Sequence, residues 1–500
     1  MMSDFSISFP LTFNAQALLM VVATYLILLH IFRYVSGPAN LPPGPVGYPV
    51  VGVLPLMRHM PHLTVQRWWQ RYGDICSMYM GSRLVVILNS VDVMRECFVN
   101  QSDVFAGRPW NYFRKLTKNK GIVFTEGEVW REHRRFTMSC LRDFGMGKVC
   151  LEPKLHEETR CFLNELAKHS GEPFDITTYL PKTVSNVICS IIYGSRFDYN
   201  DDVFVANIDA LEESVRKQTM LGIINFLPFL EVLPKILPTD KVLMRNVNMR
   251  DEYAQWQLDR HRESLDVENP RDFIDAYLTR MQNMLEQAKS STFHESHLRR
   301  TIQDLFISGS ETVTTTLKWS FLFMVLHRDV QQKVFDEIDR VVGSGRLPTM
   351  KDKTRMPYTQ ATIMECQRVG NIALFSVPRC TLADCVVNGY NIPKGTWVFV
   401  NRWGVHKAPQ YWTRPNVFDP TRFLNKDNEV VWPDTFIPFG MGPRSCPGES
   451  LAKMELFIFF TAVLQAFRLE LPDGAPTPSL EPSVGLNMSP QKYFVCATLR

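Results

Sequence analysis

The chain has 500 residues and lacks several features that would point to a common class of protein. Its 55 basic and 51 acidic residues leave a net charge of +4, which is too small to indicate nucleic acid as a partner. After residue 45 it has no internal repeat and no low-complexity block. Hydrophobic residues make up 45% and charged residues 21%, as in ordinary globular proteins. A disordered chain, a collagen and a polytopic membrane protein are therefore excluded.

Paired cysteines and nucleotide-binding fingerprints are also lacking. The 11 cysteines are scattered and odd in number, and no CxxC pair occurs. This argues against a secreted disulfide framework and favours a reducing compartment, where at most a few cysteines carry out chemistry. No GxGxxG fingerprint for a flavin or a nicotinamide follows a strand pattern. Electrons for any redox reaction must therefore come from another protein.

Only one long hydrophobic run is present, and it lies near the N-terminus. Residues 15–32 carry no formal charge, and a helix of that length, about 27 Å, just spans the core of a bilayer. A cleaved signal peptide would need a basic start and a small-x-small cleavage site, and neither is present. We predict a short lumenal segment at 1–14, a transmembrane anchor helix at 15–33 and, by the positive-inside rule, a cytosolic remainder. The prolines of residues 34–46 predict a stiff linker.

Residues 47–500 are predicted to form one large, mainly helical domain with a small β region, because no shift in composition divides them. The last predicted helix is apolar nearly all round and should be buried. A strand pattern at 84–89 and a hairpin pattern at 386–400 around Asn388-Gly389 make up the β region. Helical patterns lie at 130–141, 298–326, 330–342, 359–370 and 449–467.

The segment from Phe439 to Glu449 differs from the rest of the chain, because glycines and prolines bracket one cysteine directly before the predicted buried helix. Glycine permits the close approach of a flat ligand. The N–H groups and positive dipole of the helix should face the Cys446 sulfur, lower its pKa and favour the thiolate. Thiolates are soft ligands for iron, and Arg444 is a fixed cation suited to a carboxylate. The alternative is an inert cysteine in a tight loop.

The pattern Phe-x-x-Gly-x-x-x-Cys-x-Gly resembles that of the cytochrome P-450 family, the haem-thiolate monooxygenases. The resemblance implies the cytochrome P-450 fold, mainly α with a small β region (α+β), and haem b as cofactor. It also makes Cys446 the axial ligand of the haem iron. The segment from Cys140 to Lys148 further resembles the animal microsomal clan of family two. The other haem-contacting residues implied by the resemblance are Phe439, Gly442, Gly448, Arg444, Trp130, Arg134 and Arg379.

The predicted central helix contains Ser308-Gly309-Ser310-Glu311-Thr312, which matches the family's small-Gly-x-acid-Thr motif. By resemblance Gly309 opens a groove for dioxygen, which explains a residue that costs about 1 kcal/mol in mid-helix. Thr312 and Glu311 would pass protons inward. Ser308 stands where Ala or Gly is usual, and Val313 stands where Thr or Ser is common, but Glu311 and Thr312 are intact.

Two further residue sets follow from the resemblance. Glu365 and Arg368 match Glu-x-x-Arg, with Arg368 placed 78 residues before Cys446, and Arg422 completes a buried structural cluster. The pocket should bind its ligand mainly through apolar contacts, which favours a lipophilic substrate of moderate size. The expected pocket residues are Phe105, Phe124, Ile307, Ser308, Leu374, Phe375, Val377 and Leu486.

The implied reaction inserts one oxygen atom of O2 into a lipophilic small molecule by hydroxylation, epoxidation or dealkylation. Electrons would come from NADPH through NADPH-cytochrome P-450 reductase, with cytochrome b5 as a second candidate donor. The implied location is the endoplasmic reticulum membrane, in contact with lipid. A reductase-independent haem-thiolate isomerase or dehydratase and a non-catalytic membrane haem-binding protein stay open as alternatives. A basic cluster suits either an acidic donor or a solvated helix face: Arg131, Arg134, Arg135, Arg142 and Lys148.

Overall fold

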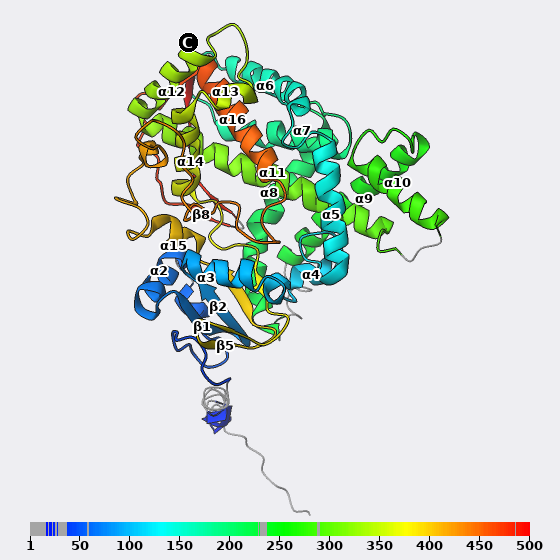
Figure 1. The fold of residues 1–500 in the computed structure, drawn as a ribbon, viewed down its shortest axis with the longest axis vertical. Coiled ribbons are helices and arrows are strands. Elements are labelled where there is room, and N and C mark those ends of the chain that lie inside the picture. The colour runs from blue at the N-terminus through cyan, green and yellow to red at the C-terminus, as the bar shows by residue number, and fades with distance from the viewer. Residues whose placement is uncertain are drawn as a thin grey trace, which may run out of the picture.

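Helices make up most of the computed structural model, and the larger sheet lies at one end of it (Figure 1). The predicted anchor at 15–33 falls largely, and the segment at 1–14 wholly, outside the described residues. Among the residues that are described, none of the helices combines the length and the apolar character that crossing a bilayer requires. The structure describes residues 17, 18, 20–22, 24, 25, 28, 38–57, 60–228, 230, 238–287, 291–485 and 487–500.

The larger sheet joins two distant parts of the chain in the order β1-β2-β6-β3. β1 (Ile75–Met80) and β2 (Arg83–Leu88) pair antiparallel, β2 pairs parallel with β6 (Trp397–Val400), and β6 pairs antiparallel with β3 (Arg379–Cys380). The strand predicted at 84–89 is confirmed as β2. Three smaller pairs are β4 (Cys385–Val387) with β5 (Tyr390–Ile392), β7 (Phe467–Glu470) with β10 (Cys496–Leu499), and β8 (Ser483–Val484) with β9 (Met488–Ser489).

The predicted hairpin is confirmed for β4 and β5. Asn388 and Gly389 form its two-residue turn with φ of 48° and 78°, as a primed turn requires. Residues 397–400, which the prediction placed in the same hairpin, instead belong to the larger sheet as β6.

The described part of the proline-rich linker lies against the sheets. The Ser77 N–H and hydroxyl in β1 donate to the carbonyls of Pro43 and Pro42, at 3.1 and 2.5 Å. Asn40 donates to the Gly389 carbonyl at 2.7 Å. Residues 40–43 are thus anchored to the body at the β end.

All five predicted helices are confirmed, with ends within three residues of the predicted ones. They are α5, α11, α12, α14 and α16. Within the described residues, the α-helices are α2 (Pro61–Tyr72), α3 (Val91–Arg95), α4 (Tyr112–Leu116), α5 (Gly127–Asp143), α6 (Glu152–Ala167), α7 (Leu180–Ile192), α8 (Asp202–Leu221), α9 (Pro238–Glu263), α10 (Phe273–Glu286), α11 (Glu295–Leu326), α12 (Arg328–Val341), α13 (Met350–Lys353), α14 (Pro357–Gly370), α15 (Arg402–Lys407) and α16 (Glu449–Ala466).

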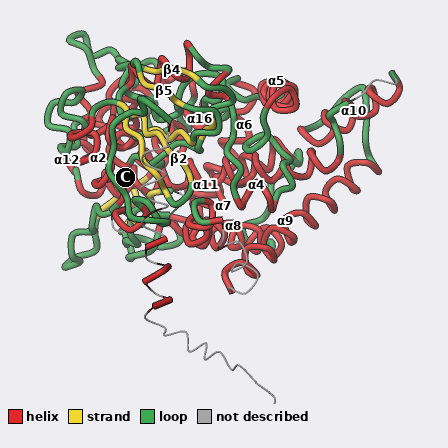
Figure 2. The backbone as a smooth tube through the Cα atoms, turned by 90° about the horizontal axis from the view of Figure 1, so that it is seen from below, coloured by secondary structure: helices red, strands yellow, loops and turns green. Residues whose placement is uncertain are grey.

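The main hydrophobic core surrounds α11, which packs against α7, α14 and α16. α16 is buried as predicted, since most of its side chains from Leu451 to Leu464 are inaccessible. α9 and α10 lie on the side away from the strands (Figures 1 and 2). The core therefore holds α11 and the start of α16 in fixed relation, and both carry predicted site residues.

Candidate functional site

Cys446 lies in a tight loop directly before α16. Its N–H donates to the Phe439 carbonyl at 2.9 Å, and Gly448 caps the helix. Gly442 has a φ of 73°, and a Cβ on it would stand 2.0 Å from the Phe98 carbonyl oxygen. Only glycine fits there, because any side chain would combine an unfavourable backbone angle with a clash. Phe439, Gly442 and Gly448 thus shape the loop that orients the sulfur.

The predicted lowering of the Cys446 pKa is wrong for the protein alone. The sulfur is accessible to solvent, yet the surrounding protein is dense enough that burial raises the pKa of the thiol. The Gly448 N–H, Arg402 and Arg134 act in the opposite direction, as expected for a helix N-terminus with nearby cations, but they do not outweigh burial. Binding a metal as thiolate must therefore release the thiol proton.

The Arg444 guanidinium packs against α5. Its Nε donates to the Ala106 carbonyl at 3.0 Å and one Nη to the Thr125 carbonyl at 2.7 Å. It lies 3.6 Å from the centre of the buried Trp130 ring, so the two side chains stack. The second Nη is buried and has no partner.

Arg134 and Arg379 approach the same loop from α5 and β3. Arg134 donates to the Ser445 carbonyl at 2.7 Å. Arg379 donates to the Met441 carbonyl at 2.9 Å and stacks on Phe98, and its second Nη is also buried without a partner. The structure therefore brings Trp130, Arg134 and Arg379 together around the Cys446 loop.

Arg108 belongs to this group but was missed from the sequence. Its buried guanidinium donates to the carbonyls of Val123, Val377 and Pro378. No motif marks Arg108, since its partners lie in segments that only the fold brings together. The one available signal was a charged residue within a largely apolar stretch.

On α11, Thr312 donates its hydroxyl to the Ser308 carbonyl at 2.9 Å. The Glu311 carboxylate accepts from Thr315 at 3.2 Å and from the Asn487 side chain. Burial raises the pKa of Glu311 although the nearby Lys318 lowers it. The helix thus presents a hydroxyl and, next to it, a carboxyl that is easily protonated.

Comparison with known proteins decides the family. The sequence model described as Cytochrome P450 matches residues 42–497. The chain belongs to the cytochrome P450 family. It is 38% identical to Cytochrome P450 2U1 of Homo sapiens over 491 residues, which is 92% of this chain and 90% of the relative. It is 39% identical to Cytochrome P450 2B4 of Oryctolagus cuniculus over 463 residues, 92% and 94% of the two chains.

These relatives confirm the resemblance to family two that the sequence showed. As a P450 monooxygenase, the chain is an oxidoreductase that uses haem b, O2 and electrons from NADPH delivered through a reductase. The mainly helical architecture with small sheets fits the P450 fold.

The P450 site has the charge that haem b requires. Burial and the neighbouring arginines lower the pKa of Arg444 to about 8 and that of Arg379 to about 9, so both guanidiniums are costly to bury without an anion. Each keeps one Nη free, and both lie beside the loop of a soft sulfur ligand. The two propionate carboxylates of haem b would supply the missing charge. The residues present therefore fit this cofactor.

Glu365, Arg368 and Arg422 lie together in the P450 body. Arg368 and Glu365, both fully buried, form a bidentate pair at 2.7 and 2.8 Å, and Arg422 joins the carboxylate at 3.1 Å. Arg368 also donates to the carbonyls of His406 and Pro415. The cluster ties α14 to the segment before the Cys446 loop.

The oxygen groove at Gly309 stays a prediction, and the structure gives this glycine a packing role as well. A Cβ on Gly309 would stand 2.9 Å from Cγ1 and 3.1 Å from Cβ of Ile188 in α7. The glycine therefore allows α11 and α7 to pack closely. A role for Gly309 at the oxygen site does not follow from its contacts.

The predicted pocket residues divide into three groups. The placement of Phe105 in the pocket is wrong, because this side chain is fully buried in the core beside Phe98. Leu486 falls outside the described residues. The others keep partly or largely accessible side chains on α11, on the segment before α5 and on the segment after α14, and they are Phe124, Ile307, Ser308, Leu374, Phe375 and Val377.

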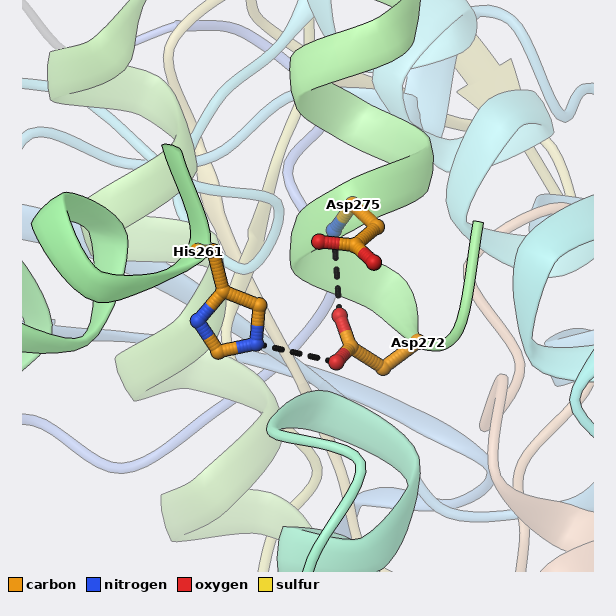
Figure 3. Close-up of side chains that lie close together, drawn as sticks. All are labelled: His261, Asp272 and Asp275. Atoms are coloured by element: carbon orange, nitrogen blue, oxygen red, sulfur yellow. Dashed lines mark hydrogen bonds and ion pairs between the residues drawn. The ribbon is translucent and has the colours of Figure 1, made fainter. Parts of the chain in front are cut away.

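A second cluster, of His261, Asp272 and Asp275, has the residue types of a metal site (Figure 3). Its hydrogen bonds show a helix cap instead. Asp272 accepts from the Asp275 N–H at 3.0 Å and from His261 at 2.9 Å, and Arg271 binds both oxygens of Asp275. These contacts join α9 to the start of α10.

Proposed function

We propose that Cys446 is the axial ligand of the haem iron and that the chain oxygenates a lipophilic small molecule by hydroxylation, epoxidation or dealkylation. The observation that carries the proposal is the pair of guanidiniums beside the Cys446 loop, Arg444 and Arg379, each of which has one buried Nη without a hydrogen-bond partner. They bind the propionates, together with Arg134 and Trp130. Thiolate-bound haem supplies oxygen activation.

The chain's own part in the chemistry is to deliver protons from α11. Burial raises the pKa of Glu311, which favours its protonated form, and Thr315 and Asn487 hold its carboxyl by hydrogen bonds. Thr312 can redirect its hydroxyl from the Ser308 carbonyl towards the ligand side of the helix. This pair favours oxygenation over the isomerase or dehydratase alternative, which needs no proton delivery to oxygen.

The electron donor and the location are also proposed. NADPH-cytochrome P450 reductase is the donor, with cytochrome b5 as a second one, and residues 15–33 anchor the chain in the endoplasmic reticulum membrane. Residues 1–14 then face the lumen, and 47–500 form the cytosolic haem domain behind the linker at 34–46. The test is extraction of membranes with carbonate, which should release a chain lacking 1–33 and retain the full chain.

The ligand assignment is tested by the reduced carbon monoxide complex. The wild type should show the red-shifted Soret band of a thiolate ligand, and Cys446→Ser should lose it. Cys150→Ser changes an exposed cysteine outside the loop and is the matched control. An unchanged band in Cys446→Ser would overturn the assignment.

The reaction is tested by product mass with purified reductase, NADPH and a panel of lipophilic compounds. Gain of one oxygen atom from 18O2, or loss of an alkyl group, supports oxygenation. Turnover of a peroxide substrate without NADPH would favour the isomerase or dehydratase. Haem binding with no NADPH consumption across the panel would favour a non-catalytic protein.

A further inference from the structure

Arg402, the first residue of α15, is held against the segment that orients Cys446. One Nη donates to the Pro438 carbonyl at 2.9 Å. The other Nη lies 3.9 Å from the position that a Cβ on Gly440 would take. Pro438 and Gly440 flank Phe439, whose carbonyl accepts the Cys446 N–H. The guanidinium therefore lies under the turn that carries the sulfur.

Arg402 has no acidic partner. Within the described part of the chain, no carboxylate forms an ion pair with it, and its Nε is buried without a hydrogen bond. Burial lowers the pKa of Arg402 to about 10, and the one charge that opposes this effect is the Cys446 thiolate. Burial and the nearby cations, Arg402 among them, hold the pKa of His406 on the same helix well below its ordinary value, so this histidine offers Arg402 no negative charge.

Arg402 also differs from the arginines proposed to bind the propionates. Arg108, Arg379, Arg134 and Arg444 act on one another, and two of them have a free Nη for a carboxylate, whereas Arg402 acts within this group on Arg379 and has no free Nη. Arg402 and Arg134 are the two cations that favour the Cys446 thiolate, and of the two only Arg402 is outside the group proposed to bind the propionates. A nearby cation stabilises negative charge on its neighbour, and it does so more strongly where a bound ligand excludes water.

We propose that Arg402 is a positioning residue for the axial thiolate: its charge keeps electron density on the Cys446 sulfur and thereby raises the reduction potential of the bound haem. The inference rests on the proposed role of Cys446 as iron ligand. Outer partners of a metal ligand tune the metal in this way, and density kept on sulfur is withheld from iron. A higher potential would favour reduction of the bound haem by the NADPH-dependent reductase.

The test is the midpoint potential of the substrate-free haem protein, measured by spectroelectrochemical titration. Arg402→Gln and Arg402→Met remove the charge, and Arg402→Lys keeps it. At a fixed electrode potential, the neutral variants should hold about tenfold less reduced haem relative to oxidised, a downward shift of about 59 mV for one electron. Arg402→Lys should stay close to the wild type. Arg280→Gln, an exposed arginine on α10, is the control and should not shift.

A second readout is the Fe–S stretching frequency from resonance Raman scattering, which should rise in the neutral variants as the sulfur donates more to iron. Two results would overturn the proposal. One is a normal thiolate band with an unchanged potential in Arg402→Gln. The other is a shift in Arg402→Lys equal to that of the neutral variants, which would assign the effect to the Pro438 hydrogen bond. Loss of the thiolate band in the wild type would instead refute the ligation by Cys446.

Discussion

At the scale of single residues, the Glu365 carboxylate is the group whose loss should damage the molecule most. It accepts from Arg368, Arg422 and the Asp419 N–H in a site that solvent does not reach. Glu365→Gln removes the negative charge and leaves Arg368 buried without a counterion. We expect unfolding free energy to fall by about 3–5 kcal/mol, with loss of haem on purification. Denaturant unfolding followed by fluorescence and by haem absorbance measures both.

The control for this change is Glu128→Gln, which breaks an exposed pair with Arg131 at 3.6 Å. An exposed pair contributes little, so stability should be almost unchanged. If Glu365→Gln were as stable as Glu128→Gln, the cluster would not hold α14 in place and its proposed structural role would be wrong.

At the scale of elements, the contact between α11 and α7 depends on Gly309. Gly309→Ala puts a methyl group against Ile188, and the overpacking should cost about 1–3 kcal/mol. The better helix propensity of alanine returns up to about 1 kcal/mol, so a net loss of stability is expected. In the Ile188→Ala background the same change should be close to neutral. A double-mutant cycle of unfolding free energies measures the coupling.

Gly345→Ala is the matched control, because a Cβ there would meet no atom within 4 Å. Equal effects of Gly309→Ala with and without Ile188 would contradict the packing explanation. If Gly309→Ala reduced the coupling of NADPH use to product formation without any loss of stability, the predicted role of Gly309 at the oxygen site would be supported.

The junction of α9 and α10 should respond to pH through His261. Its two ring nitrogens lie 2.6 Å from the Gln257 carbonyl and 2.9 Å from Asp272, so both can donate only when the ring is protonated. Burial opposes the charge, but Asp272 outweighs it and raises the pKa of His261. The stabilisation is then complete below the ordinary histidine value of about 6.5 and is lost as pH rises through the folded-state value.

Amide exchange at the start of α10 should accordingly be slower at pH 6 than at pH 8, after correction for the intrinsic rate. His261→Gln should abolish the difference, while His156→Gln, at a histidine with one hydrogen bond to the Pro348 carbonyl, should keep it. Exchange that is independent of pH in the wild type would show that the ring is not charged in this range.

These examples show which parts could be predicted from sequence. α11, α16 and the Cys446 loop carry local signals, since periodicity, glycines and the cysteine occur within one segment. The contacts of Arg108, Arg402 and Gly309 are made with segments that only the fold brings near. Phe105 was misplaced for the same reason: its neighbours decide whether an aromatic side chain lines a cavity or fills a core.

At the scale of the whole molecule, the distribution of charged residues says more about where an electron donor binds than the net charge of +4 does. α5 adjoins the Cys446 loop through the bond from Arg134 to the Ser445 carbonyl, and its exposed Arg131, Arg135 and Arg142 extend the basic character of this face. Electrons must reach the haem from outside the chain. If Cys446 is the iron ligand as proposed, a donor on this face would lie close to the haem, and an acidic donor would be attracted to it.

Charge reversal at Arg135, which forms no ion pair within the described structure, tests this face with little effect on folding. Arg135→Glu should slow reduction by the reductase about tenfold at low salt, because steering of an acidic donor is lost. The difference should shrink as ionic strength rises, since exposed charges are screened. Turnover supported by peroxide needs no donor and should be unchanged.

Arg67→Glu on α2, beside the β end, reverses an exposed charge elsewhere and should leave the reduction rate as it is. Equal slowing by both variants would mean that net charge, not the α5 face, governs the encounter, and the donor would then have to approach the haem from another side.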